Sequence, residues 1–310
     1  MRPTPESSPR LDGIVVASVT PFDPATGDLD ILALRANIRS WLATSIRGVL
    51  IGGSTGESAF IDSDERDAAL RAAREMLPPE RLLVAGTGAE STRETIRGTK
   101  RAAEAGADLV LVQPPAYYRE LMDRVALEEH YARVADASPV PVLLYQPPLR
   151  VSTVELSTPL IASLSNHPNV LGIKDSRGNL EILREILAQS AEGFQVLTGS
   201  ADRVVGALAT GAVGAVLAAA NFVPAESCAL ALAYAGGRLP EAERLQQGLL
   251  LLGKEIVAAR GVAGVKTAMD LVGLRGGVPR PPLRPLDPEG IAAVRAALEG
   301  AGVVLTHLVA

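Results

Sequence analysis

Lys174 stands at the end of an apolar segment, residues 170–173, where a side chain could do chemistry. If that segment is a buried strand, the ammonium group is poorly solvated, and desolvation lowers the pKa of a lysine and favours the neutral amine. A neutral amine condenses with a carbonyl, and the resulting iminium withdraws electrons from the adjacent carbon. The position indicates a Schiff-base nucleophile, with a lysine paired to a carboxylate such as Asp175 as the alternative interpretation.

Hydroxyl groups follow two other apolar segments in the same way. Tyr145 follows residues 140–144, so its phenol could lie beside Lys174 and relay protons, although a tyrosine with a structural hydrogen bond would look the same. Ser54 and Thr55 lie in a glycine-flanked turn before a helical pattern. Hydroxyls and backbone N–H groups that converge at such a turn suit a carboxylate, whereas the alternative is a turn whose Ser and Thr merely cap the helix.

The elements that must position these residues are short apolar segments separated by amphipathic helical patterns. Each segment is continuously apolar, which is typical of parallel strands buried on both faces. The segments are residues 14–19, 48–51, 82–85, 109–112, 140–144, 170–173, 195–197 and 212–217. Such evenly spaced β–α units predict a (β/α)8 TIM barrel, with an open doubly wound sheet as the alternative fold. Active sites of these barrels lie at the carboxyl ends of the strands, where the candidate residues stand.

Only helical patterns continue after the eighth unit. Residues 239–259, 262–271 and 288–298 are predicted helices, and a Pro-rich turn precedes the last one. We therefore expect a flexible tail at residues 1–12, a barrel at 13–235 and a C-terminal helical extension at 236–310. Within the barrel, Ser91-Thr92-Arg93-Glu94 predicts a capping box, in which Ser and Glu satisfy helix N–H groups from both directions.

Composition excludes several classes of function. The 310 residues carry a net charge of −5 with Lys and Arg scattered, so the sequence has no basic footprint for nucleic acid. A single cysteine, Cys228, excludes an intrachain disulfide and multi-cysteine metal motifs, which fits a cytoplasmic location. The N-terminus lacks the apolar region of a signal peptide. Residues 204–220 are almost wholly apolar, but glycines divide them, which favours a helix, a stop and a buried strand over a membrane span.

A set of motifs that contains the candidate residues occurs in order along the chain. They are Gly53-Ser54-Thr55-Gly56-Glu57, Tyr117-Tyr118, Tyr145 followed by Pro148, Gly172-Ile173-Lys174-Asp175-Ser176, the turn Gly199-Ser200 and residues 211–224. In these motifs, from about Gly13 to Leu286, the sequence resembles the dihydrodipicolinate synthase / N-acetylneuraminate lyase family. The resemblance implies a carbon–carbon lyase or synthase that forms a lysine Schiff base with pyruvate or another 2-oxo acid.

The resemblance also implies a role for each matching residue. Lys174 forms the Schiff base, and Tyr145 relays protons to and from the bond that is made or broken. Ser54 and Thr55 hold the carboxylate of the 2-oxo acid, and Ser54 also hydrogen-bonds Tyr145. Tyr118 reaches into the site of a neighbouring subunit, which implies a homotetramer built as a dimer of dimers. No metal or organic cofactor is implied. Further substrate contacts are expected at two other matching positions, Ser176 and Gly199.

Several stretches resemble the 4-hydroxy-2-oxoglutarate aldolase branch of this family in particular, namely residues 82–92, 117–119, 134–145 and 194–201. The resemblance thus implies an aldolase that releases pyruvate and an aldehyde. Arg150, however, stands where the synthases of the family carry an arginine for the carboxylate of the aldehyde. The alternative is therefore 4-hydroxy-tetrahydrodipicolinate synthase, which joins pyruvate to aspartate semialdehyde. Gln146 and Pro147 depart from both patterns, so the resemblance does not define the pocket for the second substrate.

Arg150 has an interpretation that is independent of the branch. A guanidinium at the barrel mouth favours a substrate with a distal carboxylate, because it can donate two parallel hydrogen bonds to that group. Both 4-hydroxy-2-oxoglutarate and aspartate semialdehyde have such a carboxylate. The alternative is a solvated arginine in a loop.

Two other classes of function fit parts of the sequence. Gly52-Gly53-Ser54-Thr55-Gly56 satisfies the G-x-S-x-G pattern of a serine hydrolase, which would also need a histidine. The histidines are His130 in a helical pattern, His167 before a proline and His307 near the end of the sequence. This interpretation leaves the lysine and the tyrosine without a role. The other class is a non-catalytic relative that binds a 2-oxo acid, against which the intact set of reactive residues argues.

Overall fold

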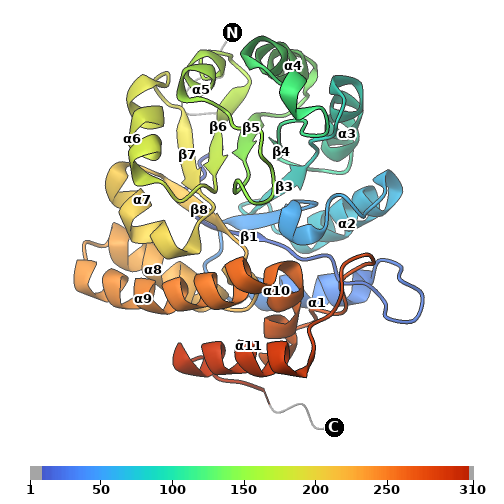
Figure 1. Ribbon diagram of the computed structural model, residues 1–310, viewed down its shortest axis with the longest axis vertical. Coiled ribbons are helices and arrows are strands. Elements are labelled where there is room, and N and C mark those ends of the chain that lie inside the picture. The colour runs from blue at the N-terminus through green and yellow to red at the C-terminus, as the bar shows by residue number, and fades with distance from the viewer. Residues whose placement is uncertain (1–8, 307–310) are drawn as a thin grey trace.

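The computed structural model describes residues 9–306, and within them eight parallel strands close into a barrel (Figure 1). Strands that follow one another along the chain pair with each other, and the first strand pairs with the last. The closure confirms the predicted TIM barrel and excludes the open sheet. Residues 1–8 of the predicted tail lie outside the described part of the chain. The strands are β1 (Gly13–Ala17), β2 (Gly48–Ile51), β3 (Leu82–Gly86), β4 (Leu109–Val112), β5 (Val142–Gln146), β6 (Val170–Asp175), β7 (Gln195–Thr198) and β8 (Gly214–Leu217).

Helices cover the outside of the barrel and follow each strand (Figure 1). They are α1 (Ile31–Leu42), α2 (Ser63–Met76), α3 (Thr92–Glu104), α4 (Arg124–Ala137), α5 (Thr158–Leu164), α6 (Leu180–Gln189), α7 (Val204–Thr210) and α8 (Pro224–Ala235). In α1 the buried residues include Leu34, Ile38 and Trp41, which share one face because they are three or four positions apart.

The chain after α8 is helical, as predicted. It forms α9 (Leu239–Leu252), a π-helical segment (Gly253–Ala258), α10 (Ala259–Leu271) and α11 (Pro288–Gly300). These helices gather on one side of the barrel, at the bottom of Figure 1. Gly261 has φ 56 and ψ −145, so the helical conformation is interrupted between the two helices expected there. A division between barrel and extension at residue 235 stays a prediction, with which this order of elements agrees.

Local sequence signals set the ends of several elements. Ser91 Oγ accepts from the N–H of Glu94 (3.1 Å) at the start of α3, but the Glu94 carboxylate bonds to Arg97 (3.3 Å) instead of completing the predicted capping box. The apolar stretch at residues 204–220 divides into α7, Gly211 in a left-handed conformation (φ 119) and β8, as predicted. None of the helices in the described chain is long and apolar enough to cross a membrane.

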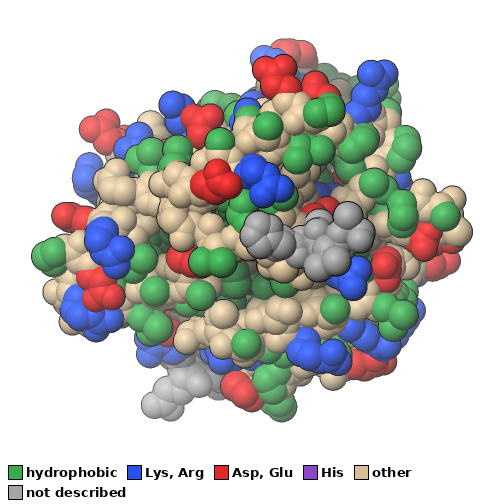
Figure 2. Space-filling model, turned by 90° about the horizontal axis from the view of Figure 1, so that it is seen from below, with side chains coloured by type: hydrophobic (Ala, Val, Ile, Leu, Met, Phe, Trp, Pro, Cys, Tyr) green, Lys and Arg blue, Asp and Glu red, His purple; other side chains and the backbone are tan. Residues whose placement is uncertain are grey.

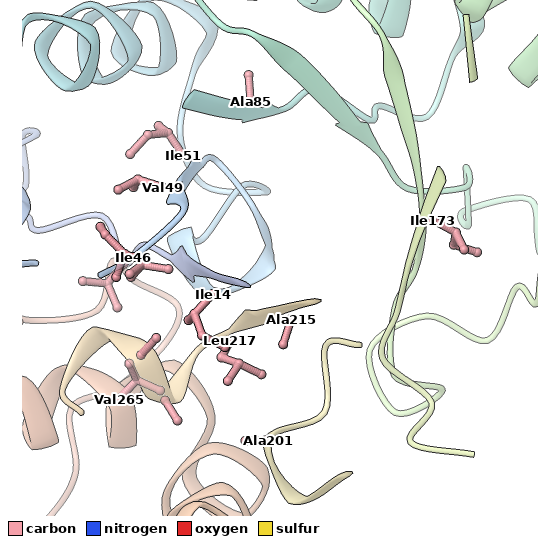
Figure 3. Packing of buried hydrophobic residues seen from close by; sticks show 14 of the residues in the cluster. Ile14, Ile46, Val49, Ile51, Ala85, Ile173, Ala201, Ala215, Leu217 and Val265 are labelled. Carbon is pink, nitrogen blue, oxygen red and sulfur yellow. The ribbon is translucent and has the colours of Figure 1, made fainter. Parts of the chain in front are cut away.

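Two apolar layers hold the barrel together. The inner layer fills the barrel and includes Val15, Leu50, Val84, Leu111, Leu143 and Leu197. The outer layer lies between the strands and the surrounding helices, and Figure 3 shows part of it around Ile14, Val49 and Leu217. Val265 of α10 belongs to the same outer layer. The C-terminal helices therefore share a continuous core with the barrel.

Asn221 connects the two strands at which the barrel closes. This buried side chain follows β8, and its Nδ2 donates to the carbonyl of Ala17 at the end of β1 (2.7 Å). Its Oδ1 accepts from the N–H of Val19 (3.0 Å), and its backbone carbonyl accepts from Trp41 Nε1 (3.0 Å). One residue thus satisfies polar groups of β1, of the segment after β1 and of α1 that would otherwise be buried without partners.

Charges of both signs are interspersed on the face that carries the C-terminal helices (Figure 2). Lys and Arg do not gather into a stripe on this face. The distribution agrees with the small negative net charge and with the scattered Lys and Arg of the sequence.

His130 is a buried histidine on α4 that contacts Thr92 at the start of α3. Its Nδ1 lies 2.9 Å from Thr92 Oγ1, and its ring meets the ring of Tyr131 edge-on. Burial lowers the pKa of His130 to about 4, because the charged imidazolium would be poorly solvated there. The native state therefore keeps this histidine neutral at pH values where an unfolded chain protonates it.

We expect the free energy of unfolding to fall as the pH is lowered from about 6.5 to about 4, since the unfolded chain then binds a proton that the native state does not. The shift of His130 corresponds to a loss of about 3 kcal/mol over this range. Urea unfolding at several pH values should show a flatter pH dependence for His130→Gln than for the wild type. His167→Gln, whose ring pairs with Asp136, is the matched control. Parallel curves for wild type and His130→Gln would contradict this assignment.

Candidate active site

Lys174 lies near the carboxyl end of β6 and faces the barrel interior because the strand is irregular. Leu171 belongs to the inner layer, and strict alternation would send a residue three positions later to the opposite face. The pairing of β5 with β6 shifts register between Val142 and Leu143, as at a β-bulge. After the shift Lys174 pairs with Tyr145, which also belongs to the inner layer. The irregularity therefore places the amine in the mouth of the barrel.

The Lys174 amine is buried and has no carboxylate partner among the described residues. The residue is 5% exposed, and its Nζ lies 4.5 Å from the centroid of the Tyr145 ring. Asp175 bonds instead to Arg177, whose Nε donates to Asp175 Oδ2 (2.9 Å). The alternative interpretation of the sequence, in which Lys174 forms an ion pair with Asp175, is therefore wrong. A poorly solvated amine of this kind is the form in which lysines act as nucleophiles toward carbonyls.

Tyr145 stands between the lysine and the turn that follows β2. It is buried at the carboxyl end of β5, and its Oη lies 3.4 Å from Ser54 Oγ, with either oxygen able to donate. Thr55 follows on the same turn and is half-buried. The structure thus brings together the amine, the phenol and the hydroxyl that the sequence places on separate segments.

The turn that carries Ser54 and Thr55 is a single 3-10 turn, Ser54–Gly56. Thr20 Oγ1 donates to the carbonyl of Gly56 (2.7 Å), which ties the turn to the segment after β1. A Cβ on Gly56 would come within 2.9 Å of a backbone carbonyl, so this close approach requires glycine. Glu57, the next residue, has φ 56, a left-handed conformation that is uncommon for a residue with a side chain.

Ser176 and Gly199 lie beside the lysine. The N–H of Ser176 donates to the carbonyl of Gln146 (3.0 Å), which joins the ends of β6 and β5. A Cβ on Gly199 would overlap Ser176 Oγ and would lie 3.0 Å from Lys174 Cε. The missing side chain at residue 199 therefore leaves the space that the lysine occupies. Substrate contacts at both residues stay predictions.

Arg150 lies in an exposed turn of the loop between β5 and α5. The N–H of Val151 donates to the carbonyl of Pro148 (2.7 Å) and closes this turn. The guanidinium has no ion pair with a described carboxylate, unlike that of Arg177. Arg150 is thus an available cation on the loop that starts after Gln146, the last residue of β5.

Gln146 and Arg177 anchor that loop, a role that sequence reasoning missed. Gln146 is buried, and its Oε1 accepts from the N–H of Leu156 (2.7 Å) near the far end of the loop. Arg177 Nη1 donates to Glu155 (2.7 Å) while the same guanidinium holds Asp175. Gln146, which departs from the family pattern, therefore shapes the loop of Arg150. Sequence reasoning flagged the departure but contained no signal for this partner ten positions away.

Tyr118 lies on the surface, in the loop between β4 and α4. It is 66% exposed, and its ring meets the ring of Tyr117 edge-on at 5.0 Å. Glu90 holds this loop by accepting from the N–H groups of Ala116 (2.9 Å) and Tyr117 (2.8 Å). Within the described part of a single chain, Tyr118 contacts the ring of Tyr117 and does not contact Lys174.

A small hollow opens beside Tyr145 at the carboxyl ends of the strands. Glycines supply much of its lining, which consists of Gly52, Gly53, Ser58, Gly86, Gly88, Leu111, Gln113 and Tyr145. A larger hollow of about 240 Å³ lies between α8, α9 and α11. Tyr145 lines the smaller hollow, and none of the candidate residues lines the larger one, so we assign the chemistry to the smaller hollow.

The contacts of Ser54 and the histidines argue against a serine hydrolase. Ser54 contacts the phenol of Tyr145 and not an imidazole. His130 contacts Thr92, and His167 pairs with Asp136 (3.1 Å). His307 lies outside the described residues.

The fold and the site together define a class of enzyme. A TIM barrel that presents a buried lysine without a carboxylate partner, next to a tyrosine at the neighbouring strand end, matches the lyases that act through a lysine Schiff base.

A family model described as the dihydrodipicolinate synthetase family matches residues 10–301. The chain is 34% identical to a 4-hydroxy-tetrahydrodipicolinate synthase from Exiguobacterium sp., covering 93% of this chain and 97% of that protein. It is also 34% identical to a probable mitochondrial 4-hydroxy-2-oxoglutarate aldolase from Emericella nidulans, covering 93% and 94%. Among solved structures, YagE of E. coli K12, a prophage protein of the dihydrodipicolinic acid synthase family in complex with pyruvate, superposes with TM-score 0.89 at 29% identity over 95% of this chain and 99% of that one. The chain belongs to the dihydrodipicolinate synthetase family, which confirms the predicted resemblance.

We expect Gly199→Ala to slow the reaction of Lys174 with a 2-oxo acid at least about tenfold, because the added methyl group displaces the lysine from its position. The rate of adduct formation with pyruvate and borohydride measures this reaction. Gly248→Ala on α9 is the matched control, since a Cβ there meets nothing within 4 Å. Equal rates for Gly199→Ala and the wild type would show that this space does not constrain the lysine.

Proposed function

We propose that the chain is a pyruvate-dependent class I aldolase that cleaves 4-hydroxy-2-oxoglutarate. The observation that carries the proposal is the arrangement of Lys174 Nζ, the Tyr145 ring at 4.5 Å and Ser54 Oγ at 3.4 Å from the phenol oxygen. Membership of a family whose named members include such an aldolase supports it.

The reaction begins with the 2-oxo acid bound through its carboxylate to the Ser54–Thr55 turn. The Lys174 amine attacks the C2 carbonyl, and loss of water gives an iminium. Tyr145, directly or through water, takes the proton of the C4 hydroxyl. The C3–C4 bond breaks, its electron pair moves into the iminium, and an aldehyde and a pyruvate enamine result. Protonation of the enamine at C3 and hydrolysis of the imine release pyruvate and regenerate the amine.

A second candidate function is 4-hydroxy-tetrahydrodipicolinate synthase, in which the same enamine attacks aspartate semialdehyde. Arg150 supports it through the family resemblance, since the synthases carry an arginine at this position for the carboxylate of the aldehyde. Relatives with either name are equally similar to the chain, at 34% identity. The aldehyde partner therefore distinguishes the two functions.

We also propose that the protein is a homotetramer built from dimers and acts in the cytoplasm. Tyr117, Tyr118, Leu121 and Val125 form an exposed apolar group near the barrel mouth, and a second copy that covers it would bring Tyr118 to the site of its neighbour. The single buried Cys228 suits a reducing compartment, although the Emericella relative is named as mitochondrial.

Borohydride reduction in the presence of pyruvate should leave a lactyl-type adduct on Lys174, which peptide mass mapping locates. Lys174→Met should remove both the adduct and turnover. Lys254→Met, which changes an exposed lysine of the extension, should leave both unchanged. If neither pyruvate nor 4-hydroxy-2-oxoglutarate labels the wild type, the Schiff-base mechanism is wrong and a non-catalytic binding protein becomes the better assignment.

Arg150→Ala should lower kcat/KM for substrates with a distal carboxylate by about 10–100-fold, the usual range for a lost hydrogen bond to a charged group. Substrates without that carboxylate should lose much less. Arg133→Ala, which removes an exposed arginine of α4, controls for the change in surface charge. An equal loss for both kinds of substrate would mean that Arg150 supports the loop and does not bind substrate.

A further inference from the structure

Glu57, directly after the Ser54–Gly56 turn, forms a buried ion pair with a lysine of the C-terminal helices. Lys266 on α10 places its Nζ 2.6 Å from Glu57 Oε1, and the two side chains are 1% and 0% exposed. Lys266 Nζ also donates to the carbonyl of Val278 (2.8 Å). Glu57 Oε2 accepts from the backbone N–H of Arg280 (2.8 Å). The segment between α10 and α11 thus contacts Glu57, the residue that follows the Ser54–Gly56 turn.

The positive groups around this carboxylate are themselves held in place. Lys266 Nζ and Arg280 Cζ lie 4.5 and 4.0 Å from the centroid of the Phe22 ring, where cations are attracted to the aromatic face. The Arg280 guanidinium donates to both carboxylate oxygens of Glu65 on α2 (2.7 and 2.6 Å). Contacts with α2 and with the segment after β1 thus hold Lys266 and Arg280, and these two residues in turn contact the Glu57 carboxylate.

The backbone of Glu57 transmits this position to the turn. Its φ of 56 and ψ of 41 lie in the left-handed region, which a residue with a side chain keeps only where the surroundings determine it. Its N–H donates to the carbonyl of Ser54 (3.2 Å) and closes the turn. A change in the conformation of Glu57 would therefore redirect the hydroxyl that contacts Tyr145.

Stability alone is a weak reason for such a pair. Desolvation of two buried charges opposes their attraction, and an apolar pair of similar size is often as stable. Loss of one partner is different, since it leaves an uncompensated charge in the core. A buried ion pair is better explained where it selects one conformation, and here the conformation selected is that of the turn at the barrel mouth.

We propose that Glu57 and Lys266 are positioning residues for the carboxylate of the 2-oxo acid. Through them the C-terminal extension sets the geometry of the Ser54–Thr55 turn and so the affinity for the first substrate. The inference rests on the proposed function, because it takes this turn to be the carboxylate site. It assigns no contact between either residue and the substrate.

The test measures the yield of the borohydride-reduced Lys174 adduct as a function of pyruvate concentration, in the full-length protein. Glu57→Gln and Lys266→Met should each raise the half-saturating pyruvate concentration by about tenfold or more, the scale expected when a hydrogen bond to a charged group is lost. The yield at saturating pyruvate should remain complete, because Lys174 itself is unchanged. A general loss of structure would instead lower the yield at saturation.

The double variant Glu57→Gln/Lys266→Met keeps the test valid if a single variant fails to fold. It contains no unpaired buried charge, so its melting temperature should lie closer to that of the wild type than those of the single variants. Its half-saturating concentration should nevertheless remain raised about fivefold or more. Val294→Ala, which weakens the buried face of α11 but leaves the ion pair intact, is the control for a loosened extension and should bind pyruvate normally.

The possible outcomes separate the two proposals. If pyruvate labels the wild type and the double variant has the same half-saturating concentration, the positioning role is wrong while the Schiff-base function stands. The same conclusion follows if Val294→Ala weakens pyruvate binding as much as the double variant does. If pyruvate does not label the wild type, the proposed function itself fails.

Discussion

The burial of one amine is the constraint on which the rest of the site depends. Removing an ammonium group from water without a carboxylate partner costs on the order of several kcal/mol. Lys174 is buried without a carboxylate partner among the described residues, since Asp175 is occupied by Arg177 and the aromatic face beside the amine is that of Tyr145. Packing in the two apolar layers stabilises the barrel. A lysine without a carboxylate partner can act as a nucleophile, whereas an ion pair with a carboxylate would favour the unreactive ammonium form.

Barrel closure turns distant residues into neighbours of this amine. Parallel strands present their carboxyl ends at one rim, so the residues that follow β2, β5, β6 and β7 meet there although they are far apart in the chain. The register of β5 on β6 sets Tyr145 opposite Lys174, and the turn after β2 brings Ser54 to the phenol. The arrangement follows from strand pairing and needs no contact between the residues before the barrel has formed.

The strands, the barrel and the residues at its rim could be predicted from the sequence because they depend on local patterns. Continuous apolar segments predicted parallel strands, and their last residues identified Lys174 and Tyr145. The bulge that turns Lys174 inward could not be predicted, since it depends on the register between two strands. The pair of Glu57 and Lys266 joins residues about 200 positions apart, so no periodicity indicates it. The roles of Gln146 and Arg177 were missed for the same reason, because both depend on where a loop returns.

The two halves of the site are supported in different ways, and this difference bears on the chemistry. The lysine and the phenol stand on buried strands, and the residue that ends the Ser54–Gly56 turn forms a buried ion pair, so the half proposed to bind the 2-oxo acid is supported by the core. The half that would receive the aldehyde is built on the loop after β5, where Arg150 is exposed and the anchors are side chains such as Gln146. Substitutions in that loop can change the aldehyde without disturbing the imine chemistry. A barrel of this construction therefore separates the residues proposed for the imine chemistry from the loop proposed to select the aldehyde.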